Sequence, residues 1–477
     1  MSTTDTPSAD AASQTGSTVA VRYQPKTRAF RRYTIFYGLG ALGLVLLFGS
    51  MSSILVPLHV QQLEFAHIFT GADAQVDLHA LNALKAQVDA GTLTPTADQH
   101  RLLGLLAQFN SSRATGLSLV TTVGALISML IQPIVGLLSD RTRSKWGRRA
   151  PWIAAGGIGG AALVALFPVV PTIAILVVVF SLTTVMLGAA QGPLMATVVD
   201  RVPENRIGAL STVTGLVVYL AGIGGSVVAG SLFAAIGLAA YFPLAVVLIL
   251  TTLCFVLFAR DRSSQRLAVE PLRTRAFLAS YVRALGDRDY RWAWIAKVLL
   301  FIGFGIANVY GLYMVQSYVK PALSATEAAQ TIPLIQLAGL PAALIGMVIS
   351  GRWSDKIGRR KPFVVAASVL LAVSFLIPFA WPTVPAMFVQ SILGSFGLGV
   401  YIVVDQALFI DLLPDPAAAG RDLGVSNLGT NVGQALGPIL AGVVVAAFGG
   451  SYGPVWPVAF GLVLLASFAI LPIKRVR

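Results

Sequence analysis

The chain has 477 residues, of which 56% are hydrophobic and only 11% are charged. A soluble domain carries roughly 25% charged residues, so this composition excludes a water-facing globular protein of the same length. The net charge of +14 would suit a nucleic-acid partner, but the basic residues gather beside apolar segments rather than in one basic domain, which argues against that class.

Residues 1–32 are predicted to form a disordered, basic N-terminus, because the first twenty are polar and offer little apolar surface to bury. A basic cluster stands just before the first apolar run: Arg22, Lys26, Arg28, Arg31 and Arg32. No short apolar segment with a small-residue cleavage site precedes that cluster. We therefore expect the first apolar run to stay in the membrane as an anchor.

Apolar runs long enough to cross a bilayer fill both halves of the chain. A bilayer core requires about 20 apolar residues per helix. We predict an all-α polytopic membrane protein with twelve spans: 33–62, 114–138, 151–169, 172–199, 207–235, 241–259, 292–318, 328–350, 361–380, 384–410, 422–447 and 455–473.

These spans divide the 34 basic residues unevenly between the two sides of the membrane. Thirty lie on one side of the membrane, and four lie on the opposite, outer side: Lys85, Arg101, Arg113 and Lys320. Because Lys and Arg mark the cytoplasmic side, we expect both termini to be cytoplasmic and the protein to lie in the cell inner membrane.

The connection after the first span, 64–113, is unusually long and reads as two helical pieces. The first has apolar residues on one helical face: Leu78, Leu81, Leu84 and Val88. The second follows a possible capping box of Thr96 and Gln99 and has its own apolar face: Leu102, Leu106 and Phe109. We predict a small extracytoplasmic helical hairpin packed on the outer rim, with a lid or a partner-binding surface as the alternative.

Two sequence landmarks occur twice. Gly136-Leu-Leu-Ser-Asp140 with Gly147-Arg-Arg149 reappears as Gly351-Arg-Trp-Ser-Asp355 with Gly358-Arg-Arg360. Asp200-Arg-Val-Pro203 reappears as Asp411-Leu-Leu-Pro414. The offset is 215 residues from Asp140 to Asp355 and 211 from Asp200 to Asp411. Two landmarks at nearly one offset indicate an internal duplication of a six-helix unit.

The duplication sets the expected domain organisation. We predict an N-terminal half at 33–259, a basic cytoplasmic linker at 260–291, a C-terminal half at 292–473 and a short cytoplasmic tail at 474–477. Repeated halves that face each other across a midplane site are typical of transporters.

The repeated loops resemble those of the major facilitator superfamily, and the resemblance covers residues 33–473. The first copy, with Ser144-Lys-Trp-Gly-Arg-Arg149 and Pro151-Trp-Ile153, is similar to the loop of sucrose transporters and related glycoside–cation symporters. Ala150 departs from those relatives, which usually have a further Arg there. The resemblance implies the major facilitator fold, two pseudo-symmetric six-helix halves and secondary transport by alternating access.

The resemblance also implies a gating role for the repeated loops, which in the superfamily latch the cytoplasmic side while the outer side is open. The gating candidates are Asp140, Arg148, Arg149, Asp200, Asp355, Arg359, Arg360 and Asp411. The alternative is a topological anchor that carries ordinary positive-inside charge.

Two absences favour symport over antiport. Drug–proton antiporters of the superfamily usually carry an Arg in span 4 and a Gly-Pro signature in span 5. Thr183–Gln191 contains no Arg, and Gly222-Ile-Gly-Gly225 lacks the proline. The pair Gly437-Pro438 has that appearance but lies in span 11.

Polar side chains within the spans are candidate substrate ligands, with helix packing as the alternative. Asn427, Asn431 and Gln434 lie at i, i+4 and i+7, on one face of span 11. Four more residues could face the same cavity: Gln191, Asn308, Gln336 and Tyr401. Amides and a phenol offer both donors and acceptors, which suits an uncharged, hydroxyl-rich substrate such as a sugar or glycoside.

Asp405 is the one acidic residue clearly inside a predicted span, and Lys297 lies at a similar depth at the start of span 7. A charge within a span is costly unless it is paired or wet, so it is a functional candidate. We predict that the two side chains approach each other and that Asp405 carries the coupling proton. A static ion pair, or no pairing, is the alternative.

The sequence contains no nucleotide-binding loop, metal-ligand cluster or nucleophile–base set, so we expect no enzyme activity and no cofactor. The expected partners are a small-molecule substrate, a coupling proton or cation and the lipid bilayer, without nucleic acid, for a monomeric protein. The predicted function is proton- or cation-coupled symport of a sugar or glycoside. The alternatives are a drug or metabolite efflux antiporter of the same superfamily and a transporter-like sensor without flux.

Overall fold

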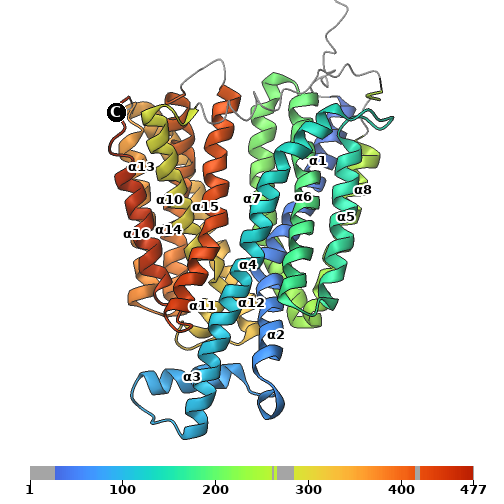
Figure 1. Ribbon diagram of the computed structural model, residues 1–477. Coiled ribbons are helices and arrows are strands. Elements are labelled where there is room, and N and C mark those ends of the chain that lie inside the picture. The colour runs from blue at the N-terminus through green and yellow to red at the C-terminus, as the bar shows by residue number, and fades with distance from the viewer. Residues whose placement is uncertain (1–26, 260–262, 266–283, 414–418, 476–477) are drawn as a thin grey trace, which may run out of the picture.

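The computed structural model describes residues 27–259, 263–265, 284–413 and 419–475, and the regular elements in this part of the chain are helices. Figure 1 shows two helical bundles side by side. The predicted N-terminus at 1–32 and linker at 260–291 fall largely outside the described residues. Ten described helices are long and apolar enough to cross a membrane, and one of these, Val217–Phe258, runs through the turn that joins α7 to α8.

The first bundle is built from the N-terminal half. Its helices are α1 (Arg28–Ser50), which continues through a π-helical turn η2 (Met51–Leu55) into α2 (Val56–Ile68), then α3 (Leu78–Asp89), α4 (Ala97–Arg141), α5 (Ala150–Leu166), α6 (Ile173–Arg201), α7 (Glu204–Ile236) and α8 (Tyr241–Phe258). Threonine side chains cap several of the helix starts: Thr27 accepts from the Phe30 amide, and Thr172 accepts from the Ile175 amide.

The second bundle is built from the C-terminal half. Its helices are α10 (Arg288–Val309), α11 (Gly311–Ser317), α12 (Ala325–Ile357), α13 (Lys361–Ala380), α14 (Val384–Asp411), α15 (Ala419–Ala447) and the shorter α16 (Val455–Ala469). α10 begins at the Asp287 cap, and α12 ends at Gly358, whose φ of 66° is a left-handed conformation that glycine adopts without strain.

The duplication is visible in the helix pairs that pack together. In the first bundle α1 packs on α7 and α8, α4 and α5 pack on α6, and α5 packs on α8. The matching pairs recur in the second bundle: α10 on α15 and α16, α12 and α13 on α14, and α13 on α16. The contacts between the bundles show the same correspondence. α4 packs on α15, and their counterparts α12 and α7 pack on each other.

The predicted hairpin is present in the 64–113 segment, although α2 extends to Ile68 before it begins. α3 packs on the start of α4 through a separate apolar cluster: Phe69, Leu81, Leu106 and Phe109. The predicted capping box is confirmed, since Thr96 and Gln99 exchange side-chain and backbone hydrogen bonds. Arg101 binds both carboxylate oxygens of Asp73, at 2.6 and 2.9 Å, and this bonding lowers the pKa of Asp73.

Two ends of the molecule can now be distinguished. The hairpin end carries α3, and the motif end carries the repeated loops at 140–149 and 355–360 (Figure 1). Hydrogen bonds between the bundles cluster toward the hairpin end, where Ser118 of α4 binds the Pro438 carbonyl of α15 at 2.6 Å and Tyr313 of α11 binds the Pro57 carbonyl of α2 at 2.7 Å.

Two spans differ from the prediction. The second hairpin piece and span 114–138 are one helix of 45 residues, α4, so Asn110 and Arg113 lie within it rather than in a loop. Span 292–318 is divided at Tyr310 into α10 and α11. Tyr310 is fully buried, and its hydroxyl binds the Ala114 carbonyl at 2.9 Å, so a tertiary contact with α4 accompanies the break.

Candidate functional site

A buried ion pair lies inside the second bundle. The Lys297 ammonium of α10 is 2.7 Å from an Asp405 carboxylate oxygen of α14, and the two side chains are only 7% and 6% exposed. The predicted approach of these residues is therefore confirmed. Lys297 also donates to the Ser426 hydroxyl of α15 at 2.6 Å and lies 4.3 Å from the centre of the Phe409 ring.

The arrangement gives the lysine two polar partners on two different helices. α10 packs closely on α15, so Lys297 joins α14 to a neighbour with which α14 has few contacts of its own. A buried charge is tolerated only when it is paired and hydrogen-bonded, which the carboxylate and the hydroxyl provide together. Tyr401, one turn before Asp405, places its hydroxyl beside the carboxylate without a hydrogen bond of ordinary geometry.

The first half of the chain does not repeat this pair. At the 211-residue offset of Asp200 and Asp411, the position that matches Asp405 is Leu194 of α6, which is 2% exposed. The same helix packing therefore forms with an apolar side chain at this position. The fold therefore does not require a carboxylate at this position.

The predicted substrate ligands fall into two groups. On α15, Asn427 and Gln434 are exposed and Asn431 is half-buried, on the motif-end side of the Pro438 contact between the bundles. Gln191 and Gln336 are half-buried on α6 and α12. None of these five amides is fully buried in the protein.

Tyr401 and Asn308 have different surroundings. Tyr401 is 1% exposed and packs against Phe301, so it belongs to the interior of the second bundle beside the ion pair rather than to an accessible surface. Asn308 is exposed, but its amide donates to the Phe304 carbonyl of its own helix at 2.8 Å.

The repeated loops form an ion cluster within the first bundle. The Arg149 guanidinium binds Asp140 at 2.5 Å and Asp200 at 3.2 Å, and it donates to the Ser139 hydroxyl at 3.0 Å. Arg148 binds the other oxygen of Asp200 at 2.5 Å. The two sequence landmarks of this half therefore meet at the motif end.

The second bundle repeats part of that cluster. Arg360 binds Asp411 at 3.4 Å and donates to the Ser354 hydroxyl at 2.6 Å, as Arg149 does with Asp200 and Ser139. Arg359 is exposed, and the prediction for the Asp355 side chain lies outside what the structure describes. Landmarks that are some fifty residues apart in sequence are thus joined by ion pairs in both halves.

A model of the Major Facilitator Superfamily matches residues 101–346 and 323–475. The chain belongs to this superfamily. As a superfamily transporter it is a multi-pass membrane protein, in agreement with its apolar helices.

Solved structures show the same fold. A mutant form of the nucleoside transporter NupG aligns over 92% of this chain and 99% of its own, with a TM-score of 0.68 and 14% identity. An auto-inhibited POT family peptide transporter gives a TM-score of 0.61 at 14% identity, covering 92% of this chain and 96% of its own. The human organic anion transporter MFSD10 (TETRAN) gives a TM-score of 0.57 at 18% identity, covering 94% of this chain and all of its own.

One curated relative shares a short segment. An uncharacterized symporter of Synechocystis sp. is 54% identical to this superfamily member over 39 residues, which is 8% of this chain. The matched segment spans 7% of that symporter's length.

Sequence reasoning missed the contacts around Arg113 at the hairpin end of this transporter. Arg113 was expected outside the spans, but it is 1% exposed and donates to Tyr452 at 3.0 Å and to Gln61 and Gln316 at 3.2 Å each. Its guanidinium also lies 4.4 Å from the centre of the Tyr313 ring. The absence of Gly and Pro between Leu105 and Thr115 was the available signal that the helix continues through this position.

Proposed function

We propose that this superfamily member is a proton- or cation-coupled secondary transporter of a small, uncharged, hydroxyl-rich solute such as a sugar or glycoside. The observation that carries the proposal is the buried Lys297–Asp405 pair, at 2.7 Å. An ionisable residue within a transmembrane segment is costly, and it marks an ion pathway more often than a packing contact.

Asp405 is the proposed coupling group. When its carboxylate binds a proton, the ion pair to Lys297 is replaced by a neutral acid beside an ammonium that keeps its hydrogen bond to Ser426. Release of the proton restores the pair. Lys297 therefore has a partner in both states, which lowers the cost of separating it from Asp405.

The amides that are not fully buried are the proposed solute ligands. Asn427, Asn431 and Gln434 lie on one face of α15, and α15 packs against the other bundle through α4. An amide both donates and accepts hydrogen bonds, so it matches hydroxyl groups better than it matches a fixed charge. NupG, whose fold this chain shares, is a nucleoside transporter, which is compatible with a hydroxyl-bearing solute for the present chain.

Symport and orientation complete the proposal. The Synechocystis relative is named a symporter, which supports symport for the present chain. We place the motif end and both termini on the cytoplasmic side of the inner membrane, because 30 of 34 basic residues then face the cytoplasm. In that orientation the loop cluster of Asp140, Arg149 and Asp200 would gate the cytoplasmic end.

The test is uptake of labelled sucrose and labelled uridine into vesicles that contain the purified protein, with and without an imposed pH gradient. We expect the gradient to drive accumulation of at least one solute. Asp405→Asn is expected to abolish accumulation against a gradient while exchange down a gradient continues. Asp98→Asn, an exposed acid at the hairpin end, is the matched control and should behave as the wild type.

Three results would contradict the proposal. Uptake of solute into acid-loaded vesicles, in exchange for protons that leave down their gradient, would indicate a proton-coupled antiporter. Binding without flux under every gradient would indicate a sensor. Normal pH-driven accumulation by Asp405→Asn would remove Asp405 from the coupling step while leaving transport itself intact.

A further inference from the structure

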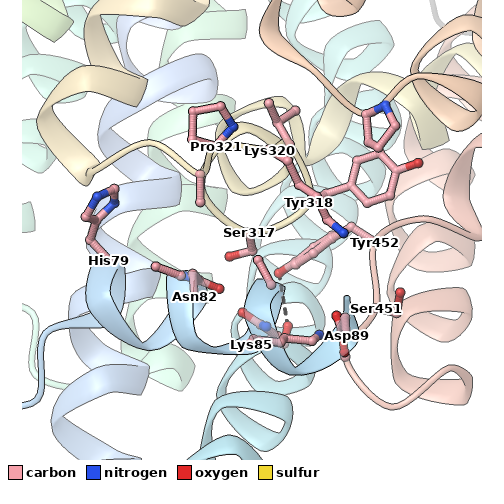
Figure 2. A pocket seen from close by; sticks show the side chains of 17 residues that line it. His79, Asn82, Lys85, Asp89, Ser317, Tyr318, Lys320, Pro321, Ser451 and Tyr452 are labelled. Atoms are coloured by element: carbon pink, nitrogen blue, oxygen red, sulfur yellow. Dashed lines mark hydrogen bonds between the residues drawn. The ribbon is translucent and has the colours of Figure 1, made fainter. Parts of the chain in front are cut away.

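A cavity lies at the hairpin end, outside the proposed transport site. Its volume is about 400 Å³, and its walls come from α3, from the segment after α11 and from the turn between α15 and α16. Polar side chains from both halves of the chain line it: Asn82, Lys85, Asn110, Lys320, Ser451 and Tyr452. Figure 2 labels all of them except Asn110, and it shows the labelled side chains gathered around one space between α3 and the second bundle.

Two of the lining groups have unused hydrogen-bonding capacity. Asn110 is only 2% exposed, and its side-chain oxygen has no hydrogen-bond partner within the described part of the chain. The side-chain oxygen of Asn82 is also buried and without a partner there, while its amide group donates to the Leu78 carbonyl. Buried polar atoms are nearly always hydrogen-bonded, so each unsatisfied atom requires an explanation.

The floor of the cavity is fixed by the contacts that join the halves. The Tyr452 hydroxyl donates to the Asn110 backbone carbonyl at 3.1 Å and accepts from buried Arg113 at 3.0 Å. The Asn110 backbone is therefore tied to Tyr452 of the second bundle at the cavity wall. The unpaired side-chain oxygen of Asn110 is itself buried, so a donor that enters the cavity reaches it only when a neighbouring side chain moves.

The lining chemistry selects a class of ligand. Two unpaired amide oxygens require donors, and the ammonium groups of Lys85 and Lys320 require acceptors. A hydroxyl group meets both requirements. A simple anion would satisfy the two lysines and leave the two amide oxygens unpaired, and Asp89 on the same wall would repel it.

We propose that this cavity is a second, peripheral binding site for a small, uncharged, hydroxyl-rich solute. The proposal rests on the proposed function, because it gives the hairpin end the same solute class as the transport site. The walls come from both bundles, so the site is complete only while the hairpin end is closed. Solute bound there favours the closed arrangement, since a ligand shifts an equilibrium toward the state that it binds better.

The experiment is protection from cysteine labelling on the purified full-length chain in detergent, in a Cys254→Ser background. Ala83 lines the cavity, whereas Gln87 is exposed on the same helix and does not line it. Ala83→Cys and Gln87→Cys are labelled with a maleimide in the presence of sucrose, uridine, sorbitol or the anion gluconate. With a solute at about ten times its dissociation constant, simple competition slows labelling about tenfold.

We expect slower labelling at Ala83→Cys with at least one neutral probe and an unchanged rate at Gln87→Cys. Adding Asn82→Leu, or separately Asn110→Leu, should remove the protection, and the first of these variants leaves the contacts between the bundles intact. Unchanged labelling with all the neutral probes, or protection by gluconate alone, would overturn the proposal. The readout requires no flux, so loss of protection with normal transport rejects the peripheral site alone, and protection without transport rejects the proposed function alone.

Discussion

Lys297 and Asp405 show at the residue scale how a costly contact can be placed where the fold does not need it. Removing two charges from water costs several kcal/mol per ion, and the mutual attraction of the pair offsets this only with good geometry. The matching position of the first half holds Leu194, and the equivalent helices pack there without an ion pair. The second half holds a carboxylate at a position where the first half packs a leucine, which is the asymmetry expected of a group that serves ion coupling.

This asymmetry makes a prediction about stability. Asp405→Leu leaves the Lys297 ammonium buried without its carboxylate, 7% exposed, and should lower the free energy of unfolding by about 3–5 kcal/mol. Lys297→Met in the same chain removes the unpaired charge and should restore stability to within about 1 kcal/mol of the wild type. Thermal unfolding of the purified variants in detergent measures both effects.

The double variant also separates packing from function. We expect Lys297→Met with Asp405→Leu to fold as well as the wild type and to have lost accumulation against a gradient. A double variant as unstable as Asp405→Leu alone would show that the pair is a structural requirement of the second bundle. Coupled accumulation by a stable double variant would show that the pair is dispensable for function.

At the scale of the elements, the two ion clusters at the motif end are alike in plan and different in strength. Asp200 accepts from two arginines and is 20% exposed, whereas Asp411 accepts from Arg360 at 3.4 Å and is 44% exposed. Exposed pairs are screened by water and contribute little, while enclosed carboxylates with several charged donors contribute more. The first bundle therefore has the stronger joint between the end of α6 and the loop before α5.

The difference between the clusters predicts unequal effects of one substitution. Asp200→Ala should lower the free energy of unfolding by about 1–3 kcal/mol, because two hydrogen bonds to charged groups are lost. Asp411→Ala should cost about 1 kcal/mol or less. Thermal unfolding of the two variants side by side, each serving as the control of the other, gives the comparison. Equal losses, or a larger loss for Asp411→Ala, would contradict this ranking of the clusters.

The helices themselves show which features were predictable from the sequence. Spans such as 361–380 and 384–410 were found almost to the residue, because a bilayer-length apolar run bounded by polar residues has one simple interpretation. The full length of α4 was not predicted, because the polar residues from Asn110 to Arg113 look like the end of a loop. Their burial depends on Tyr452 and Gln316, which lie more than 200 residues away in the chain.

The candidate site likewise has features that were predictable from the sequence and features that were not. The depth of Lys297 and Asp405 could be judged from distances along two helices, so their approach was predictable. Tyr401 was expected to face the cavity, but a single phenol on an apolar helix does not reveal which neighbour it meets. The joining of Asp200 to Arg149 was not anticipated, because repeats at a common offset identify equivalent residues without showing which of them touch.

At the scale of the whole molecule, the proposed orientation in the membrane rests on charge alone and can be tested directly. Gln87 is exposed on α3 at the hairpin end, and Lys145 is exposed in the first loop of the motif end. In a Cys254→Ser background, Gln87→Cys should react with an impermeant maleimide on intact cells, and Lys145→Cys should react only after the membrane is opened. The reverse labelling pattern would show that the protein has the opposite orientation in the membrane, with most of its basic residues outside.

Closure of the hairpin end depends on backbone contact as well as hydrogen bonds. α7 and α12 cross where Gly230 faces Ala329, and a methyl group added to Gly230 would collide with the Ala329 carbonyl oxygen. Gly224, in the same helix, has no neighbouring atom within 4 Å of such a methyl group. Both substitutions to alanine favour the helix equally, by about 1 kcal/mol, so any difference between them reports the contact between the bundles.

Gly230→Ala should therefore push the bundles apart at the hairpin end and shift the population toward open states there, while Gly224→Ala should not. Spin labels at two exposed positions, Ala235 of α7 and Thr326 of α12, measure the separation in the Cys254→Ser background. We expect longer and broader distances in Gly230→Ala and wild-type distances in Gly224→Ala, because interfaces between rigid bundles switch between discrete arrangements rather than deform continuously. Identical distances in the two variants would mean that the crossing of α7 and α12 absorbs a methyl group locally, and closure would then rest on the hydrogen bonds between the bundles, such as those of Arg113, Ser118 and Tyr313.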